Sequence, residues 1–150
     1  LSSIQNSDGE FIPKIKISEN VEKITNPGDK TIYRVYDKET GKIRADLICF
    51  ADETWNEEDE LLLFDPNATW KKTRLPGGSY TMKEILLPIF KHGECVYESP
   101  SVMEIAQFCK EEKETLWDET KRLFNPHGVY VDLSRSLYDT KTRLLDEMSK

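Results

Sequence analysis

The chain has 150 residues, of which 37% are hydrophobic and 33% charged, and its 28 acidic against 21 basic side chains give a formal net charge of -7. This length allows one globular core, whereas the acidity argues against binding to nucleic acid or to an anionic membrane. No apolar run approaches the roughly 20 residues that span a bilayer, and the first ten residues lack a secretory signal, so we expect a cytoplasmic protein.

The N-terminal segment predicts a strand and a tight turn. The chain starts at Leu1 and not at a methionine, and a polar stretch leads into the apolar alternation of residues 11–18. We interpret this as a fragment that begins within a hairpin, followed by a half-buried strand. Pro27 and Gly28 suit the central positions of a type II turn, in which glycine supplies the positive φ.

Residues 31–51 are predicted to form a β-hairpin. Residues 31–36 are rich in β-branched and aromatic side chains, which favour strands. Residues 37–42 have the composition of a hairpin loop, with Gly41 at the position expected to be left-handed, and residues 43–51 return as the partner strand.

An acidic segment follows the hairpin. Residues 52–60 carry six carboxylates in nine positions and predict a solvated loop. An EF-hand is excluded because its loop requires a glycine, and this run has none.

Three short apolar segments come next. Residues 61–64 predict a buried strand or a turn of helix, closed by a type I turn at residues 65–67. Residues 70–75 predict a strand that ends at Pro76-Gly77-Gly78. Residues 85–90 are predicted to be buried, as a strand or a short helix, with Gly93 as a residue that follows a helix.

The C-terminal third predicts two helices. Pro100 is placed at the first helical position, and Ser101 with Glu104 has the spacing of a capping box. The helix is expected to reach about Phe124, before Asn125-Pro126 ends it. Its buried face would carry residues spaced by about 3.6 positions, namely Val102, Ile105, Phe108, Cys109, Leu116 and Leu123.

Residues 129–133 predict a short strand, and Ser134 is expected to cap a last helix. One side of that helix would carry Leu137, Lys141, Leu144, Leu145 and Met148. These elements together predict an α+β fold, in which a small antiparallel sheet of hairpins is followed by two helices.

Histidine and cysteine are the first candidates for chemistry. His92 and Cys95 form an H-x-x-C pair, and His127 lies in a turn, but no local group would orient a catalytic base. Cys49, Cys95 and Cys109 are odd in number and widely spaced, which indicates neither a disulfide framework nor a zinc site. We expect reduced, mostly buried thiols, with Cys109 on the buried face of its helix.

Glycine-containing segments suggest phosphate binding only weakly. Gly41-Lys42 resembles the end of a phosphate-binding loop, but Ile43 stands where serine or threonine would hold magnesium. Pro76-Gly77-Gly78 could present amides to an anion, yet no helix N-terminus completes a cradle. Both are interpreted as turns.

The remaining candidates have structural interpretations. The glycosylation sequon at residues 67–69 is treated as chance, and Trp55, Trp70 and Trp117 as core or rim residues. Glu57-Glu58 and Asp59-Glu60 lie in one loop and so do not face each other across a cleft as an acid/base pair would. Lys14 and Lys16 could face an anion, although a solvated strand edge is the favoured interpretation.

Four blocks resemble one family in their order and spacing. They are KIKISEN with ITNPGDKTIYR, then ADL, then LLPIFKHGECVYESPSVMEI, and finally NPHGVYVDLSRSLYDTKTRLL. The chain is similar to the C-terminal segment of nicotinate phosphoribosyltransferase, the lobe that follows the catalytic barrel of a type II phosphoribosyltransferase. Residues 1–30 would be the exit segment of that barrel, and residues 31–150 the C-terminal domain.

The resemblance implies a role in NAD salvage. The family condenses nicotinate with phosphoribosyl pyrophosphate to nicotinate mononucleotide and pyrophosphate, coupled to ATP hydrolysis through a phosphorylated histidine. Its active-site parts lie upstream in the barrel, and neither His92 nor His127 stands in the phosphohistidine context. The resemblance therefore implies that this segment carries no catalytic, substrate-binding or metal-binding residue.

ATP and magnesium are implied for the full enzyme only, and this segment alone is expected to be inactive and to bind no cofactor. The expected partners are the remainder of the phosphoribosyltransferase chain and its dimer mate, with no nucleic acid and no membrane. The alternative is a stand-alone acidic α+β protein-binding module that has reused this lobe.

Overall fold

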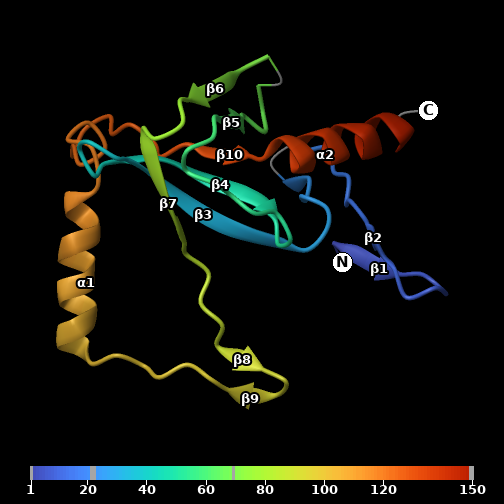
Figure 1. Cartoon of the computed structure of the whole chain (residues 1–150), viewed down its shortest axis with the longest axis horizontal. Helices are drawn as coiled ribbons and strands as arrows, with labels where there is room; N and C mark the ends of the chain where they lie inside the picture. Colours follow the sequence, from blue (N-terminus) through green and yellow to red (C-terminus); the bar gives the residue numbers. More distant parts are fainter. Residues whose placement is uncertain (1, 21–22, 69, 149–150) are drawn as a thin grey trace.

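A six-stranded sheet forms the centre of the computed structural model, which describes residues 2–20, 23–68 and 70–148 (Figure 1). Its strand order is β6-β5-β10-β4-β3-β7. β10 runs parallel to β4, and the other pairs are antiparallel. The α+β class is confirmed, with a mixed main sheet. Its strands are β3 (Lys30–Asp37), β4 (Ile43–Phe50), β5 (Leu61–Phe64), β6 (Lys72–Leu75), β7 (Tyr80–Glu84) and β10 (Val131–Leu133).

The predicted β3–β4 hairpin is confirmed. Val35 pairs with Ala45, and a bulge follows Val35. Gly41 adopts a φ of +67°. Asp37 Oδ1 accepts hydrogen bonds from the amide and the hydroxyl of Thr40, both at 2.8 Å. The loop therefore holds the register in which alternate residues of both strands enter the core.

The core lies against one face of this sheet. It consists of Val35, Ala45, Leu47, Cys49, Leu61, Leu63, Leu75 and Tyr80. The acidic loop is confirmed and runs along the core, since Trp55 packs against it and the Tyr80 hydroxyl donates to the Asp59 carbonyl at 2.9 Å. Residues 61–64 are a strand and not a helical turn, because β5 pairs on both sides.

The C-terminal helix α2 (Arg135–Met148) is buried only at its start, and the N-terminal strands β1 (Ser3–Gln5) and β2 (Phe11–Pro13) form a separate hairpin. The Ser134 cap is confirmed, because its Oγ accepts from the Leu137 amide at the start of α2 at 3.3 Å. Leu137 is buried, whereas Met148 is exposed. The strand predicted over residues 11–18 is too long: β2 pairs only with β1 and stops where that partner ends.

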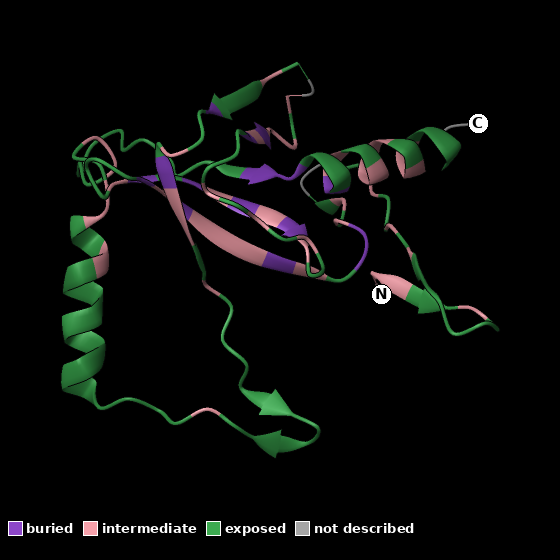
Figure 2. Cartoon of the chain, viewed as in Figure 1, coloured by how far each residue is buried: buried purple, intermediate pink, exposed green. Residues whose placement is uncertain are grey.

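The strand predicted over residues 70–75 is confirmed as β6, although it begins at Lys72 and Trp70 is 84% exposed. Two predictions for residues 85–93 are wrong. The apolar run of residues 85–90 is not buried, because the chain leaves the sheet after β7 (Figure 2). Gly93 does not follow a helix. It lies with His92 in the turn of a small hairpin, where both residues have positive φ, between β8 (Phe90–Lys91) and β9 (Glu94–Cys95).

The first helix is shorter than predicted and extends away from the sheet (Figure 1). α1 (Val102–Glu114) has the predicted capping box between Ser101 and Glu104. Pro100 precedes the cap residue and is not the first helical residue. The helix ends at Glu114 and not near Phe124, and it contains no buried residue. Within the described ranges, no helix is long and apolar enough to cross a membrane.

Candidate functional site

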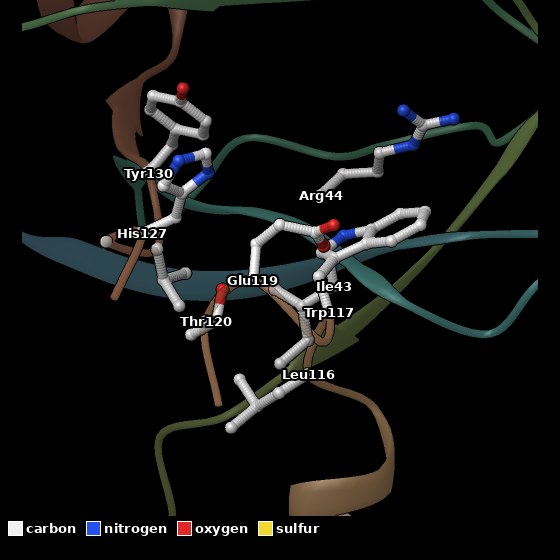
Figure 3. Close-up of a pocket in the computed structure, with 10 residues that line it drawn as sticks. Ile43, Arg44, Leu116, Trp117, Glu119, Thr120, His127 and Tyr130 are labelled. Carbon is white, nitrogen blue, oxygen red and sulfur yellow. The ribbon is translucent and has the colours of Figure 1, made fainter. Parts of the chain in front are cut away.

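A pocket of about 390 Å³ lies where the start of β4 meets the segment between α1 and β10 (Figure 3). Backbone and side-chain bonds hold this segment: the Ile43 amide donates to the Thr115 carbonyl at 2.9 Å, and Trp117 Nε1 donates to the Ile43 carbonyl at 2.6 Å. Lys42 Nζ donates to the Glu114 and Leu116 carbonyls at 2.7 and 3.2 Å. Gly41-Lys42 thus belongs to a hairpin turn, as interpreted from the sequence.

One side of the pocket carries a cation that is already paired. The Arg44 guanidinium lies 5.8 Å from the Trp117 ring centroid and donates to Asp37 Oδ2. The Thr40 amide and hydroxyl, followed by Arg44, lower the pKa of Asp37 to about 2. Arg44 therefore stabilises the β3–β4 turn through Asp37, and the Asp37 carboxylate partly neutralises the charge that Arg44 presents to the pocket.

His127 and Tyr130 lie on the other side, opposite Arg44 and Trp117 (Figure 3). The His127 amide donates to the Glu119 carbonyl at 3.1 Å. Among the described residues, no hydrogen bond joins the His127 ring to a hydroxyl, a thiol or a carboxylate. Such a bond is what a nucleophile activated by histidine requires.

The other histidine and the cysteines are not brought together. His92 lies at the tip of the β8–β9 hairpin, and the nearby Cys95 is exposed and donates to the Tyr97 carbonyl at 3.6 Å. Cys49 is buried as expected, where burial raises the thiol pKa to about 11. The expectation for Cys109 is wrong: it is exposed, like the rest of α1, which contains no buried residue. No group of three or more potential metal ligands occurs in the described ranges.

The glycine turn after β6 is occupied by the chain itself. The Gly78 amide donates to the Glu57 carbonyl at 2.7 Å. A Cβ atom at Gly77 would lie 2.0 Å from the Glu58 carbonyl oxygen. The turn therefore packs against the acidic loop and does not offer these amides to an anion.

Carboxylates of the acidic loop contact neighbouring strands, and the two lysines considered as anion ligands are exposed. Glu57 Oε1 accepts from the Met82 amide at 2.7 Å, and Glu60 pairs with Arg74 at 3.1 Å. These carboxylates brace β6 and β7 and do not face each other as an acid/base pair. Lys14 and Lys16 are exposed on the segment after β2. Thr69 of the sequon lies outside the described residues.

A charged cluster that the sequence analysis missed joins α1 to the sheet. Arg34 donates from Nε and Nη2 to the two oxygens of Asp46 at 2.8 and 3.0 Å, and from Nη1 to Glu112 at 3.0 Å. The Asp46 hydrogen bonds are the largest cause of a raised Arg34 pKa. The hairpin pattern could have placed Arg34 opposite Asp46, but the contact with Glu112 depends on tertiary structure.

A second missed feature is a buried carboxylate. Asp132 is 7% exposed, and among the described residues its carboxylate has no hydrogen bond. Burial, and then the charge of Asp65, raise its pKa. With Asp65 and Lys141 it lines a hollow of about 470 Å³. Burial lowers the pKa of Lys141, whose Nζ donates to Asn26 Oδ1 at 2.9 Å.

One long segment exposes many apolar side chains. Residues 85–109, which we call the apolar arm, comprise the chain after β7, the β8–β9 hairpin and the first half of α1 (Figure 2). Its hairpin forms a separate two-stranded sheet, and its helix has no buried residue. Its large exposed apolar side chains are Leu86, Leu87, Ile89, Phe90, Val96, Val102, Met103, Ile105 and Phe108.

The sequence matches the family described as the nicotinate phosphoribosyltransferase C-terminal domain over residues 29–141. A nicotinate phosphoribosyltransferase of Bacillus subtilis (strain 168) is 31% identical over 141 residues, which are 94% of this chain and 28% of the relative. One of Caenorhabditis elegans is 32% identical over 127 residues, 84% of this chain and 22% of the relative. The chain thus spans about a quarter of the length of these relatives.

The fold is also similar to a solved structure. The crystal structure of human nicotinic acid phosphoribosyltransferase aligns with a TM-score of 0.66 and 21% sequence identity. The alignment covers 84% of this chain and 24% of the human chain. At this identity the likeness concerns the fold alone.

Proposed function

Because the chain belongs to the nicotinate phosphoribosyltransferase family, as its C-terminal domain, we propose that it works within an enzyme of NAD salvage. That enzyme would form nicotinate mononucleotide and pyrophosphate from nicotinate and phosphoribosyl pyrophosphate, with hydrolysis of ATP. ATP and magnesium would be bound by other parts of the enzyme.

Within that enzyme, this domain has a supporting role and no catalytic residue. The observation that carries this proposal is the use of its polar groups inside the fold. Arg44 is paired with Asp37, Arg34 with Asp46, and the Gly78 amide with the Glu57 carbonyl. Groups that are held in such contacts are poorly placed to move protons or to stabilise charge on a substrate.

Residues 1–30 form the exit segment of the catalytic barrel in this account, and residues 31–150 the domain itself. The arrangement of the β1–β2 hairpin supports this division, since within the described ranges its two strands pair with each other and not with the main sheet. The main sheet, by contrast, begins with β3 at Lys30.

The partners are the remainder of the enzyme chain and its dimer mate, and the enzyme acts in the cytoplasm without nucleic acid or membrane. The net charge of -7 supports this choice because like charges repel phosphate backbones and anionic lipids. The exposed apolar side chains of the arm supply a surface on which the remainder of the enzyme chain can pack.

Product formation tests the proposal. Nicotinate, phosphoribosyl pyrophosphate and Mg-ATP are supplied to the complete enzyme and, separately, to residues 1–150, whose folding is checked by circular dichroism. We expect nicotinate mononucleotide from the complete enzyme and none from the folded chain alone. Turnover by the chain alone, or none by the complete enzyme, contradicts the proposal.

A further inference from the structure

The apolar arm exposes more apolar surface than a solvated segment of a domain normally does. Nine large apolar side chains of residues 85–109 are exposed, among them Phe90 at 70%, Val102 at 79% and Met103 at 78%. Exposed apolar surface of this extent is unfavourable in water, and larger exposed apolar areas mark interaction sites in native proteins.

The arm has little internal support between its two attachments. At one end the Ile85 amide donates to the Ile32 carbonyl at 3.0 Å, and at the other Glu112 reaches Arg34. Between them, in the part of the chain that the structure describes, β8 and β9 pair only with each other, and α1 has no buried residue. A two-stranded hairpin and a helix of 13 residues are both marginal in water on their own, so contacts within the arm contribute little to its stability.

The composition of the arm is that of an interface core. Charged residues make up 33% of the whole chain but only four of the 25 residues in the arm, namely Lys91, Glu94, Glu98 and Glu104. The centres of protein interfaces are depleted of charge in the same way. Three of these four residues are acidic, and they would lie around an apolar contact.

Charge and length together indicate the occupant. A second copy would place an acidic arm against another chain with a net charge of -7, which opposes association. The match covers only 28% of the Bacillus subtilis protein. The remaining part of such a polypeptide is therefore a second candidate for the surface that covers the arm. An apolar surface with lysine or arginine at its edge would complement the arm.

We propose that the apolar arm docks onto the remainder of its own nicotinate phosphoribosyltransferase polypeptide, through an apolar surface with a basic edge. This inference rests on the proposed function. Docking covers Leu87, Phe90 and Phe108 and fixes α1 against that surface.

The reactivity of two thiols within the arm shows whether a docked surface covers it. Cys95 and Cys109 are exposed in the domain by itself, whereas Cys49 in the core is buried. In the complete enzyme, labelling by a maleimide is followed by peptide mass spectrometry. We expect Cys95 and Cys109 to react at least about tenfold more slowly than an exposed thiol, because their reaction requires the arm to open.

A matched pair of variants locates the contact. Leu87 in the arm and Met148 at the end of α2 are exposed to 65% and 62% in the domain. In the complete enzyme, Leu87→Glu is expected to restore fast labelling of Cys109, and Met148→Glu is not. Cys49 should stay unreactive in both variants, which shows that the core remains folded.

Three results overturn the inference. They are fast labelling of Cys109 in the native enzyme, slow labelling that Leu87→Glu leaves unchanged, and protection that disappears on dilution together with dimer dissociation. The last result would identify a second copy as the occupant. Product formation separates this inference from the proposed function: an active enzyme with fast labelling disproves only the docking, and a protected but inactive one disproves only the function.

Discussion

Arg34 in β3 donates from Nη1 to Oε2 of Glu112, in the last turn of α1, across 3.0 Å. The same guanidinium binds both oxygens of Asp46 on the neighbouring strand. Asp46 thus holds the Arg34 guanidinium on the sheet, and Arg34 in turn holds the C-terminal end of α1. Because α1 contains no buried residue, this contact and the bonds made by Lys42 to the chain after α1 determine where the arm leaves the domain.

Replacing Glu112 by alanine should loosen α1 without unfolding the sheet. A partly exposed ion pair contributes about 1 kcal/mol or less to global stability, so the melting temperature should change little. Hydrogen exchange of the amides in residues 102–114 of the domain should increase. Glu111→Ala is the control, since among the described residues Glu111 accepts a side-chain hydrogen bond only from Gln107 of its own helix. Equal exchange in the two variants would show that the pair does not anchor α1.

Gly28→Ala should destabilise the domain more than Gly41→Ala. Both glycines have positive φ, at +78° and +67°, which costs an alanine about 1 kcal/mol or more. A Cβ atom at Gly28 would also lie 2.4 Å from Cε1 of Phe50, whereas nothing lies within 4 Å of one at Gly41. Chemical denaturation should therefore show an additional loss of about 1–3 kcal/mol for Gly28→Ala. Equal losses would mean that Phe50 moves aside freely.

Asp37 should make the domain sensitive to acid. Its folded-state pKa of about 2 lies below its ordinary value of 3.8, so its stabilising effect is present above pH 3.8 and disappears as the pH falls towards 2. Asp37→Asn should cost about 2 kcal/mol at neutral pH, through weaker bonds to Thr40 and Arg44, and should flatten the dependence on pH in this range. Unfolding curves between these pH values, with Asp139→Asn as an exposed control, test both effects.

Asp132 should stabilise the domain at low pH and destabilise it at neutral pH, which is the opposite of the effect of Asp37. Burial raises its folded-state pKa above the unfolded value, so the folded state binds the proton more tightly. Its contribution is greatest at low pH and is lost as the pH rises through the folded pKa, where an unpaired carboxylate becomes charged inside the fold. Asp132→Asn should therefore raise the melting temperature at pH 7. A lower melting temperature would indicate that the ionised carboxylate is stabilised in the folded domain.

Local patterns predicted the local structures well. The alternation in residues 31–51 and the position of Gly41 predicted the β3–β4 hairpin, and serine with a following helical period predicted both helix caps. Each of these features depends on neighbours in the sequence, which is why a single chain was enough to find them.

Burial was predicted less well. The periodicity of Val102, Ile105 and Phe108 indicates that one face of α1 should be covered, and the apolar run of residues 85–90 indicates the same for that segment. Neither pattern specifies whether the cover comes from this chain. Both segments are exposed, and β7, whose sequence alternates only weakly, takes the edge of the sheet in their place.

We propose above that this domain supports an enzyme without taking part in its chemistry. The most direct test is kcat for nicotinate mononucleotide formation by the complete enzyme carrying both His92→Gln and His127→Gln. We predict a value within about twofold of that of the unmodified enzyme, because neither ring is arranged as an acid or a base. A loss of about 100-fold or more at an unchanged melting temperature, the size of a general acid/base contribution, would contradict it.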